Sequence, residues 1–218
     1  MIGLYAGYKR QDDSKNKVHI KTTSNVDLEN RSEFIKKMYT NYLLKSPCNK
    51  MYKLSILNEH NIRFSPNISL GEDYRFNLTY LRYSKKYTFI EDILYMYNRK
   101  STGLSSKYTP DRLYVKLDNW RYHKNILLEE KMDDLEYLYK EYIIICLSGI
   151  ADFSKQKNKK ELIYKYMKDD RITEELKEIT IKSMSSKLKI MAKILNIKVY
   201  WIIIMLGKFA MLYKNITN

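Results

Sequence analysis

The pattern of apolar and polar positions predicts a first half in which strands and helices are mixed. Residues 1–8 are mostly apolar, and residues 18–23 alternate apolar and polar side chains, so each is typical of a strand. After Asn30, apolar residues return every three or four positions, which predicts a helix. Residues 87–99 are rich in β-branched and aromatic side chains, which favours one or two further strands.

The second half of the chain has a helical pattern throughout. The pair Thr109-Pro110 predicts a helix start, because threonine caps a helix and proline suits its first position. Further helical patterns cover residues 133–151, 159–168 and 172–184. We therefore divide the chain into three regions, 1–108, 109–184 and 185–218.

The last region is strongly basic, although the whole chain already carries a formal charge of +15. No Asp or Glu follows Glu178, while seven lysines do: Lys182, Lys187, Lys189, Lys193, Lys198, Lys208 and Lys214. Such an excess indicates an anionic partner. Arginines are few and long apolar side chains are interleaved with the lysines, which argues against nucleic acid. Residues 185–218 fit an amphipathic helix on an anionic membrane surface, with a core helix or a membrane span as the alternatives.

The cysteines and histidines show no metal-binding pattern. Cys48 and Cys146 form no spaced framework, and we interpret both as buried, reduced thiols. The three histidines have no ligand spacing, so the sequence predicts no metal site from them.

The stretch "GEDYRFNLTYL" places Gly71, Glu72 and Asp73 at the head of an apolar periodic run. Acids in the first turn of a helix stabilise it through the helix dipole, which is one explanation of the pair. A carboxylate that acts as a general base is the other. Neighbouring motifs favour the second explanation.

Those motifs are "SPCNKMYK", "IRFSPNISLGEDYRFNLTYL" and "YTFIEDILYMYNRKSTGLSS", in this order. Together they resemble the second half of family 2 glycosyltransferases, the bacterial enzymes that build surface polysaccharides. The resemblance covers about residues 1–108. It implies an α/β class, with a partial GT-A-like mixed sheet and flanking helices, followed by a mostly α-helical C-terminal region.

The resemblance also implies roles for individual residues. Asp73 corresponds to the general base that takes the acceptor hydroxyl proton, and Glu72 to a residue that binds the acceptor or orients the base. Gly71 would let the backbone approach the substrates. Arg99 and Lys100 follow the "YMYN" strand, where a cation would stabilise the leaving diphosphate or simply lie in solvent. Lys50 matches the family's Asn-Lys element, and either faces the donor or packs its stem on the core.

The family's donor half would precede these elements, and it normally holds Mn²⁺ or Mg²⁺ with an Asp-x-Asp motif. This sequence has no Asp-x-Asp and no glycine-rich phosphate loop. We therefore expect a fragment or split form, weak or inactive alone, that transfers a sugar from a nucleotide-diphospho-sugar to a glycan or lipid-linked acceptor. A separate donor-half polypeptide is one expected partner. The alternative is a non-catalytic, membrane-associated accessory protein. Both predict a cytoplasmic protein peripheral to the inner face of the cell membrane.

Overall fold

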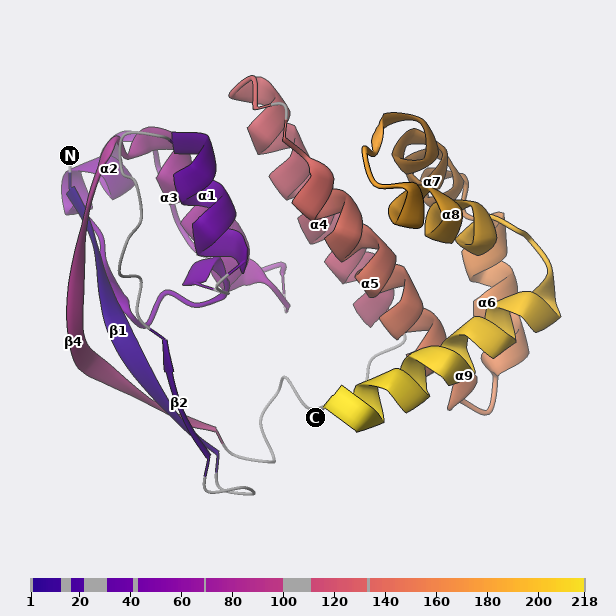
Figure 1. Ribbon diagram of the computed structural model, residues 1–218. Coiled ribbons are helices and arrows are strands. Elements are labelled where there is room, and N and C mark those ends of the chain that lie inside the picture. The colour runs from indigo at the N-terminus through magenta and orange to yellow at the C-terminus, as the bar shows by residue number, and fades with distance from the viewer. Residues whose placement is uncertain are drawn as a thin grey trace. The chain divides into compact units, whose positions relative to one another are not determined.

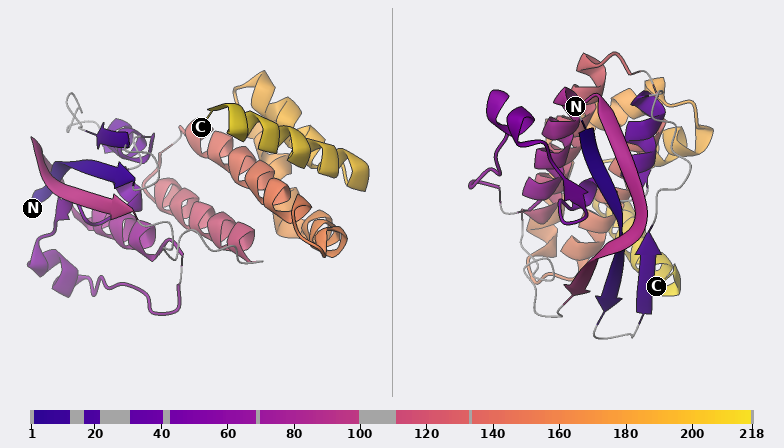
Figure 2. Two further views of the ribbon diagram at one scale, coloured as in Figure 1. Left: turned by 90° about the horizontal axis from the view of Figure 1, so that it is seen from below. Right: turned by 90° about the vertical axis from the view of Figure 1, so that its left-hand side faces the viewer.

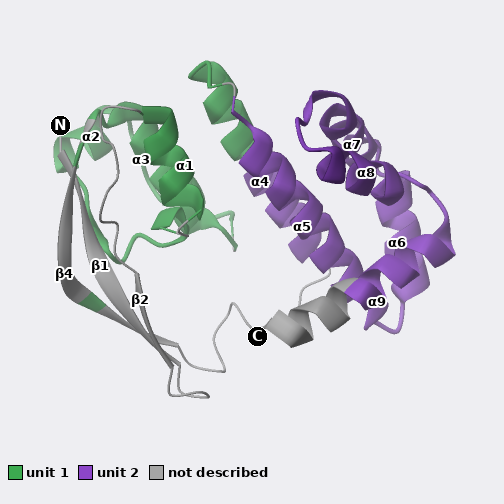
Figure 3. Cartoon of the chain, in the orientation of Figure 1, with its two compact units in different colours: residues 1–109, 121–132 green, residues 110–120, 133–218 purple. Residues whose placement is uncertain are grey.

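The computed structural model describes residues 2–12, 17–21, 31–40, 43–68, 70–99, 111–132 and 134–217 (Figure 1). The described chain divides into two compact units (Figure 3). Unit 1 comprises residues 1–109 and 121–132, and unit 2 comprises residues 110–120 and 133–218. The predicted helix start at Thr109-Pro110 lies outside the described residues, and helix α4 begins at Arg112.

Unit 1 contains the strands, which pair around β1. Among its described residues, the strands are β1 (Ile2–Asp12), β2 (Lys17–Lys21), β3 (Lys50–Met51) and β4 (Lys86–Arg99). β1 pairs antiparallel with β2 along its second half and with β3 near Leu4 and Tyr5. β4 runs parallel to β1 along its length, with register shifts around Gly7, and Figure 2 shows these strands side by side. Met51 and Lys50 therefore lie opposite Leu4 and Tyr5.

The helices of unit 1 bury their apolar faces in a small core. They are α1 (Arg31–Thr40), the 3-10 helix η1 (Leu43–Lys45), α2 (Leu54–Glu59) and α3 (Glu72–Tyr83). A buried cluster joins α2 to α3 and consists of Ile56, Ile62, Phe76 and Tyr80. This cluster anchors α3, whose first turn carries the Glu72-Asp73 pair.

Arg31 ties four segments of unit 1 together. Its guanidinium makes two hydrogen bonds to the Glu130 carboxylate, as a planar fork is suited to do. It also donates to the carbonyl oxygens of Leu81 at 2.7 Å and Ser84 at 3.0 Å, and to the Tyr87 hydroxyl at 2.9 Å. The start of α1 is thereby linked to the end of α3, the start of β4 and the turn after α4.

Unit 2 is a helical assembly in which α5 packs against α6, α8 and α9. Its elements are the first part of α4 (Arg112–Glu129), α5 (Glu136–Ser154), α6 (Lys159–Lys168), α7 (Asp170–Lys182), α8 (Ser186–Leu195) and α9 (Tyr200–Thr217). The Trp120 indole donates to the Leu138 carbonyl at 2.7 Å and packs edge-on against Tyr142. These contacts fix α4 to α5.

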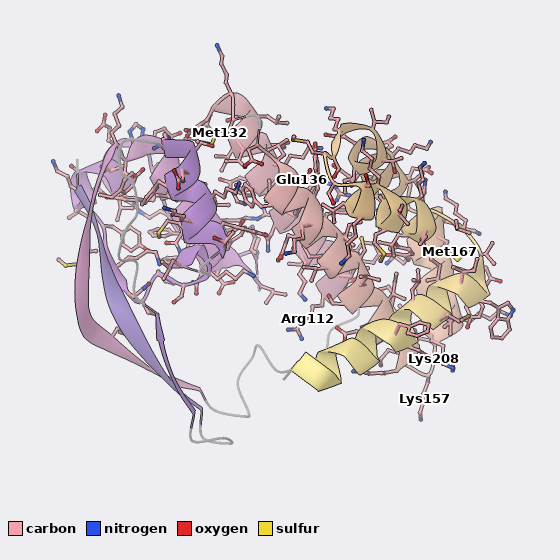
Figure 4. All side chains as sticks on the ribbon, in the orientation of Figure 1. Arg112, Met132, Glu136, Lys157, Met167 and Lys208 are labelled. Atoms are coloured by element: carbon pink, nitrogen blue, oxygen red, sulfur yellow. The ribbon has the colours of Figure 1, made fainter. Side chains whose placement is uncertain are left out.

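Glu136 organises the junction between α7 and α8. Its carboxylate accepts hydrogen bonds from the Ser183 hydroxyl at 2.8 Å and from the backbone N–H groups of Met184 and Ser185 at 3.0 and 3.1 Å. Figure 4 labels Glu136 on α5, where it lies toward α7 and α8. One charged side chain thus satisfies backbone donors that a chain reversal would otherwise leave unpaired.

The fold class predicted from the sequence, α/β with a partial GT-A-like mixed sheet, is wrong. Most of the described residues are helical, and strands occur in four segments, one of them only two residues long. An α/β class requires parallel strands that alternate with helices. Here β1 and β4 are the parallel pair in the described range, and six helices follow one another from α4 to α9. Local strand patterns in the first 99 residues do not amount to such a sheet.

Among the residues that the structure describes, no helix has both the length and the apolar character needed to cross a membrane.

Candidate functional site

The predicted site residues lie at two places in unit 1. Gly71, Glu72 and Asp73 form the start of α3, and Lys50 lies in β3. Arg99 is the last residue of β4, of which only the backbone is described at that point. Lys100 lies outside the described residues.

The start of α3 has a backbone that needs glycine. Gly71 precedes the helix with φ 87°, in the left-handed region that side chains other than glycine rarely adopt. Its carbonyl accepts from the Arg75 N–H at 3.0 Å and closes the first turn. Glu72 and Asp73 are thereby held in that turn, at the positive end of the helix dipole.

Two separate sets of hydrogen bonds hold the polar side chains near this turn. The Lys50 ammonium donates to the Asn49 side-chain oxygen at 2.8 Å and to the Ser46 carbonyl. The Tyr52 hydroxyl donates to the Asn77 side-chain oxygen. The Asn77 amide in turn donates to the Leu44 carbonyl at 2.7 Å.

Lys50, Tyr52, Asp73 and Asn77 are called here the Asp73 cluster. Asn77 lies one helical turn after Asp73 and therefore on the same side of α3. The charge of Asp73 acts on both Lys50 and Tyr52. The structure thus brings together Lys50 and Asp73, which the sequence analysis selected, with Tyr52 and Asn77, which it did not.

The pKa of the Asp73 carboxyl is raised above its ordinary value. Burial is the largest cause, and the negative charge of Glu72 adds to it, while Lys50 acts in the opposite direction. The dipole of α3 taken alone favours the ionised carboxylate. Loss of solvation and the charge of the adjacent Glu72 therefore outweigh the opposite effect of Lys50.

The pKa values of Lys50 and Tyr52 are shifted by partial burial as well. Burial lowers the pKa of Lys50 to about 7, although the charges of Cys48 and Asp73 act to raise it. Burial raises the pKa of the Tyr52 hydroxyl, and the charge of Asp73 raises it further. Tyr52 is therefore a stable neutral donor, whereas Lys50 changes its charge near neutral pH.

This arrangement is suited to moving a proton. A carboxylate with a raised pKa binds a proton more readily than an ordinary aspartate, which is the property of a general base. Asn77 and Tyr52 are fixed by their own hydrogen bonds, so their polar groups hold defined positions within the cluster. Lys50 adds a cation whose charge depends on pH around 7.

The sequence held a signal for one of the two residues that were missed. Asn77 falls among the apolar positions of α3 and is buried, so an amide at that place needs a specific partner. Tyr52 had no such signal, because tyrosine is common throughout this chain. One expectation near the cluster is wrong: Cys48 is exposed, whereas Cys146 is buried as predicted.

The described residues show no metal-binding group at this site, and neither a family model nor a curated protein matches the chain. Within the described part of the chain, no group of three or more His, Cys, Asp or Glu side chains is placed to hold a metal ion. A scan against family models and a search of curated proteins give no match to this chain. The resemblance to family 2 glycosyltransferases therefore rests on the sequence motifs alone.

Proposed function

We propose that this chain carries the acceptor side of a sugar-transfer site, with Asp73 as the general base. In this reaction the Asp73 carboxylate takes the proton of an acceptor hydroxyl as the hydroxyl oxygen attacks the anomeric carbon of a nucleotide-diphospho-sugar. The new glycosidic bond forms as the bond to the diphosphate oxygen breaks, and the nucleoside diphosphate leaves. The acceptors are glycan or lipid-linked hydroxyl groups of the cell envelope.

The observation that carries the proposal is the position of Asp73 in the first turn of α3, where burial and the neighbouring Glu72 raise the pKa of its carboxyl. General bases work best when their pKa lies closer to the working pH than that of an ordinary carboxylate. The motifs around Lys50, Asp73 and Arg99 follow the order that resembles family 2 glycosyltransferases. This resemblance is the reason for proposing a nucleotide-diphospho-sugar donor and a hydroxyl acceptor. The sequence lacks Asp-x-Asp, so we expect slow transfer by this chain alone, with Mn²⁺ or Mg²⁺ supplied.

The test is a transfer assay with several nucleotide-diphospho-sugars and neutral oligosaccharide acceptors, in Mn²⁺ or Mg²⁺. Asp73→Asn keeps the size of the side chain and removes the base, so we expect turnover to fall about 100-fold or more. Asp170→Asn is the matched control, since Asp170 also lies in the first turn of a helix, α7, but outside the cluster. Its turnover should equal that of the wild type.

A second readout covers the case of very slow turnover. Binding of the same oligosaccharides, followed by ligand-observed NMR, should weaken in Asp73→Asn and remain in Asp170→Asn. Turnover and binding that are equal in wild type and Asp73→Asn would refute the proposal. So would the absence of both in the wild-type chain.

A non-catalytic, membrane-associated accessory role is the second candidate. It is favoured by an exposed apolar face on α9, in a unit that does not contain the Asp73 cluster. Oligosaccharide binding that depends on Asp73 would count against this role, and vesicle binding without any saccharide binding would favour it.

A further inference from the structure

Helix α9 uses one face to pack inside unit 2. Ile203, Ile204 and Gly207 are buried, and α9 packs against α5. A Cβ atom added at Gly207 would lie 2.7 Å from the Ser154 hydroxyl oxygen and 3.2 Å from the Ile150 carbonyl oxygen. Glycine at this position therefore allows the two helices to approach closely, and it fixes which face of α9 is turned inward.

The other face of α9 exposes large apolar side chains. Trp201, Met205 and Phe209 are 72%, 56% and 63% exposed, and their spacing of four residues places them in one stripe along the helix. Ile197 and Val199, just before the helix, are exposed as well. A stripe of large, exposed apolar side chains along one helix face marks a binding surface.

The charges around the stripe indicate which kind of partner binds it. Lys198 precedes the helix, Lys208 lies between Met205 and Phe209 in the sequence, and both lysines are exposed. No acidic residue follows Glu178, so residues 179–218 carry seven lysines without a compensating charge. A second copy of this chain would bring the same positive segment against itself, whereas an anionic lipid surface is complementary to it.

We propose that the stripe of Trp201, Met205 and Phe209, together with Lys198 and Lys208, binds α9 flat on the surface of an anionic bilayer. The apolar side chains enter the boundary between headgroups and acyl chains, where tryptophan is favoured. The lysines extend their charged ends to the lipid phosphates. Part of unit 2 then lies at the membrane surface without crossing it. This inference does not depend on the proposed sugar transfer.

The test is sedimentation of the purified full chain with vesicles of phosphatidylcholine mixed with phosphatidylglycerol, and with vesicles of phosphatidylcholine alone. We expect binding to the anionic vesicles, and a loss of about fivefold for each of Lys198→Gln and Lys208→Gln. Trp201→Ser/Phe209→Ser should reduce binding at least tenfold, because the apolar anchor is removed. The matched control is Leu54→Ser/Leu128→Ser, which removes side chains 67% and 49% exposed in unit 1.

The control variant should bind like the wild type. Equal losses in the two double variants would overturn the proposal, since binding would then follow general surface hydrophobicity. Equal binding to neutral and anionic vesicles would also overturn it. Light scattering without vesicles tests whether a second copy of the chain covers the stripe instead. If the wild type is a dimer, Trp201→Ser/Phe209→Ser is a monomer and vesicle binding is unchanged, the stripe is assigned to a second copy.

Discussion

Replacing Lys50 with methionine should remove a pH dependence of stability that this lysine creates. Its pKa falls from 10.5 to about 7 on folding because the ammonium group loses solvent. Between these values the unfolded chain binds a proton that the folded chain does not, so the free energy of unfolding rises with pH. The stabilisation is complete above pH 10.5 and is lost as the pH falls toward 7. Integration from pH 7 to 9 gives about 2 kcal/mol.

The measurement is urea unfolding of wild type and Lys50→Met at several pH values from 7 to 9. The difference between their free energies of unfolding should change by about 2 kcal/mol over this range, in favour of the wild type at higher pH. Lys53→Met is the control, since Lys53 is exposed on the same segment and its variant should keep the wild-type pH dependence. Parallel curves for wild type and Lys50→Met would refute the reasoning, because they would mean that Lys50 keeps its proton in the folded chain.

Three further predictions concern buried or half-buried ionisable groups. Because the pKa of Asp73 is raised, the contribution of this carboxyl to stability is lost as the pH rises through that pKa. Asp73→Asn should therefore unfold at a higher urea concentration than the wild type at pH 7. A lower urea midpoint for the variant would contradict this. Burial lowers the pKa of His123 from 6.5 to about 3, so stability is lost as the pH falls below 6.5. Between pH 6.5 and 4.5 the free energy of unfolding of the wild type should fall by about 2 kcal/mol more than that of His123→Leu. Urea unfolding at both pH values will measure this difference. Glu136→Gln should lower the free energy of unfolding by about 1–3 kcal/mol, because a neutral amide replaces the carboxylate that accepts from Ser183, Met184 and Ser185. Thermal unfolding will test this, with Glu174→Gln, at an exposed position, as the control.

The helices were the most predictable part of the structure. The apolar pattern over residues 159–168 matches α6 (Lys159–Lys168), and the run from Gly71 matches α3 closely. A helix closes its hydrogen bonds within one segment, so its apolar spacing and its end residues are readable locally.

The strands show what a local sequence pattern cannot predict. Residues 1–8 and 87–99 were predicted to be extended, but the sequence does not state that β1 and β4 run parallel or that β3 is two residues long. Strand pairing joins segments far apart in the chain, and the same strand pattern is compatible with several sheets. For this reason the fold class was wrong although several strand positions were close.

The sequence by itself determined the approximate positions of α3, α5, α6 and α7, the place of Glu72 and Asp73 at the head of α3, and the basic character of residues 179–218. Tertiary structure decided that Tyr52 and Asn77 join Lys50 and Asp73, that the pKa of Asp73 is raised, and that Trp201, Met205 and Phe209 remain outside while Gly207 faces α5. Helix positions depend on spacing within a segment. Loss of solvation and exposure depend on which segments pack together, and only the folded chain supplies that information.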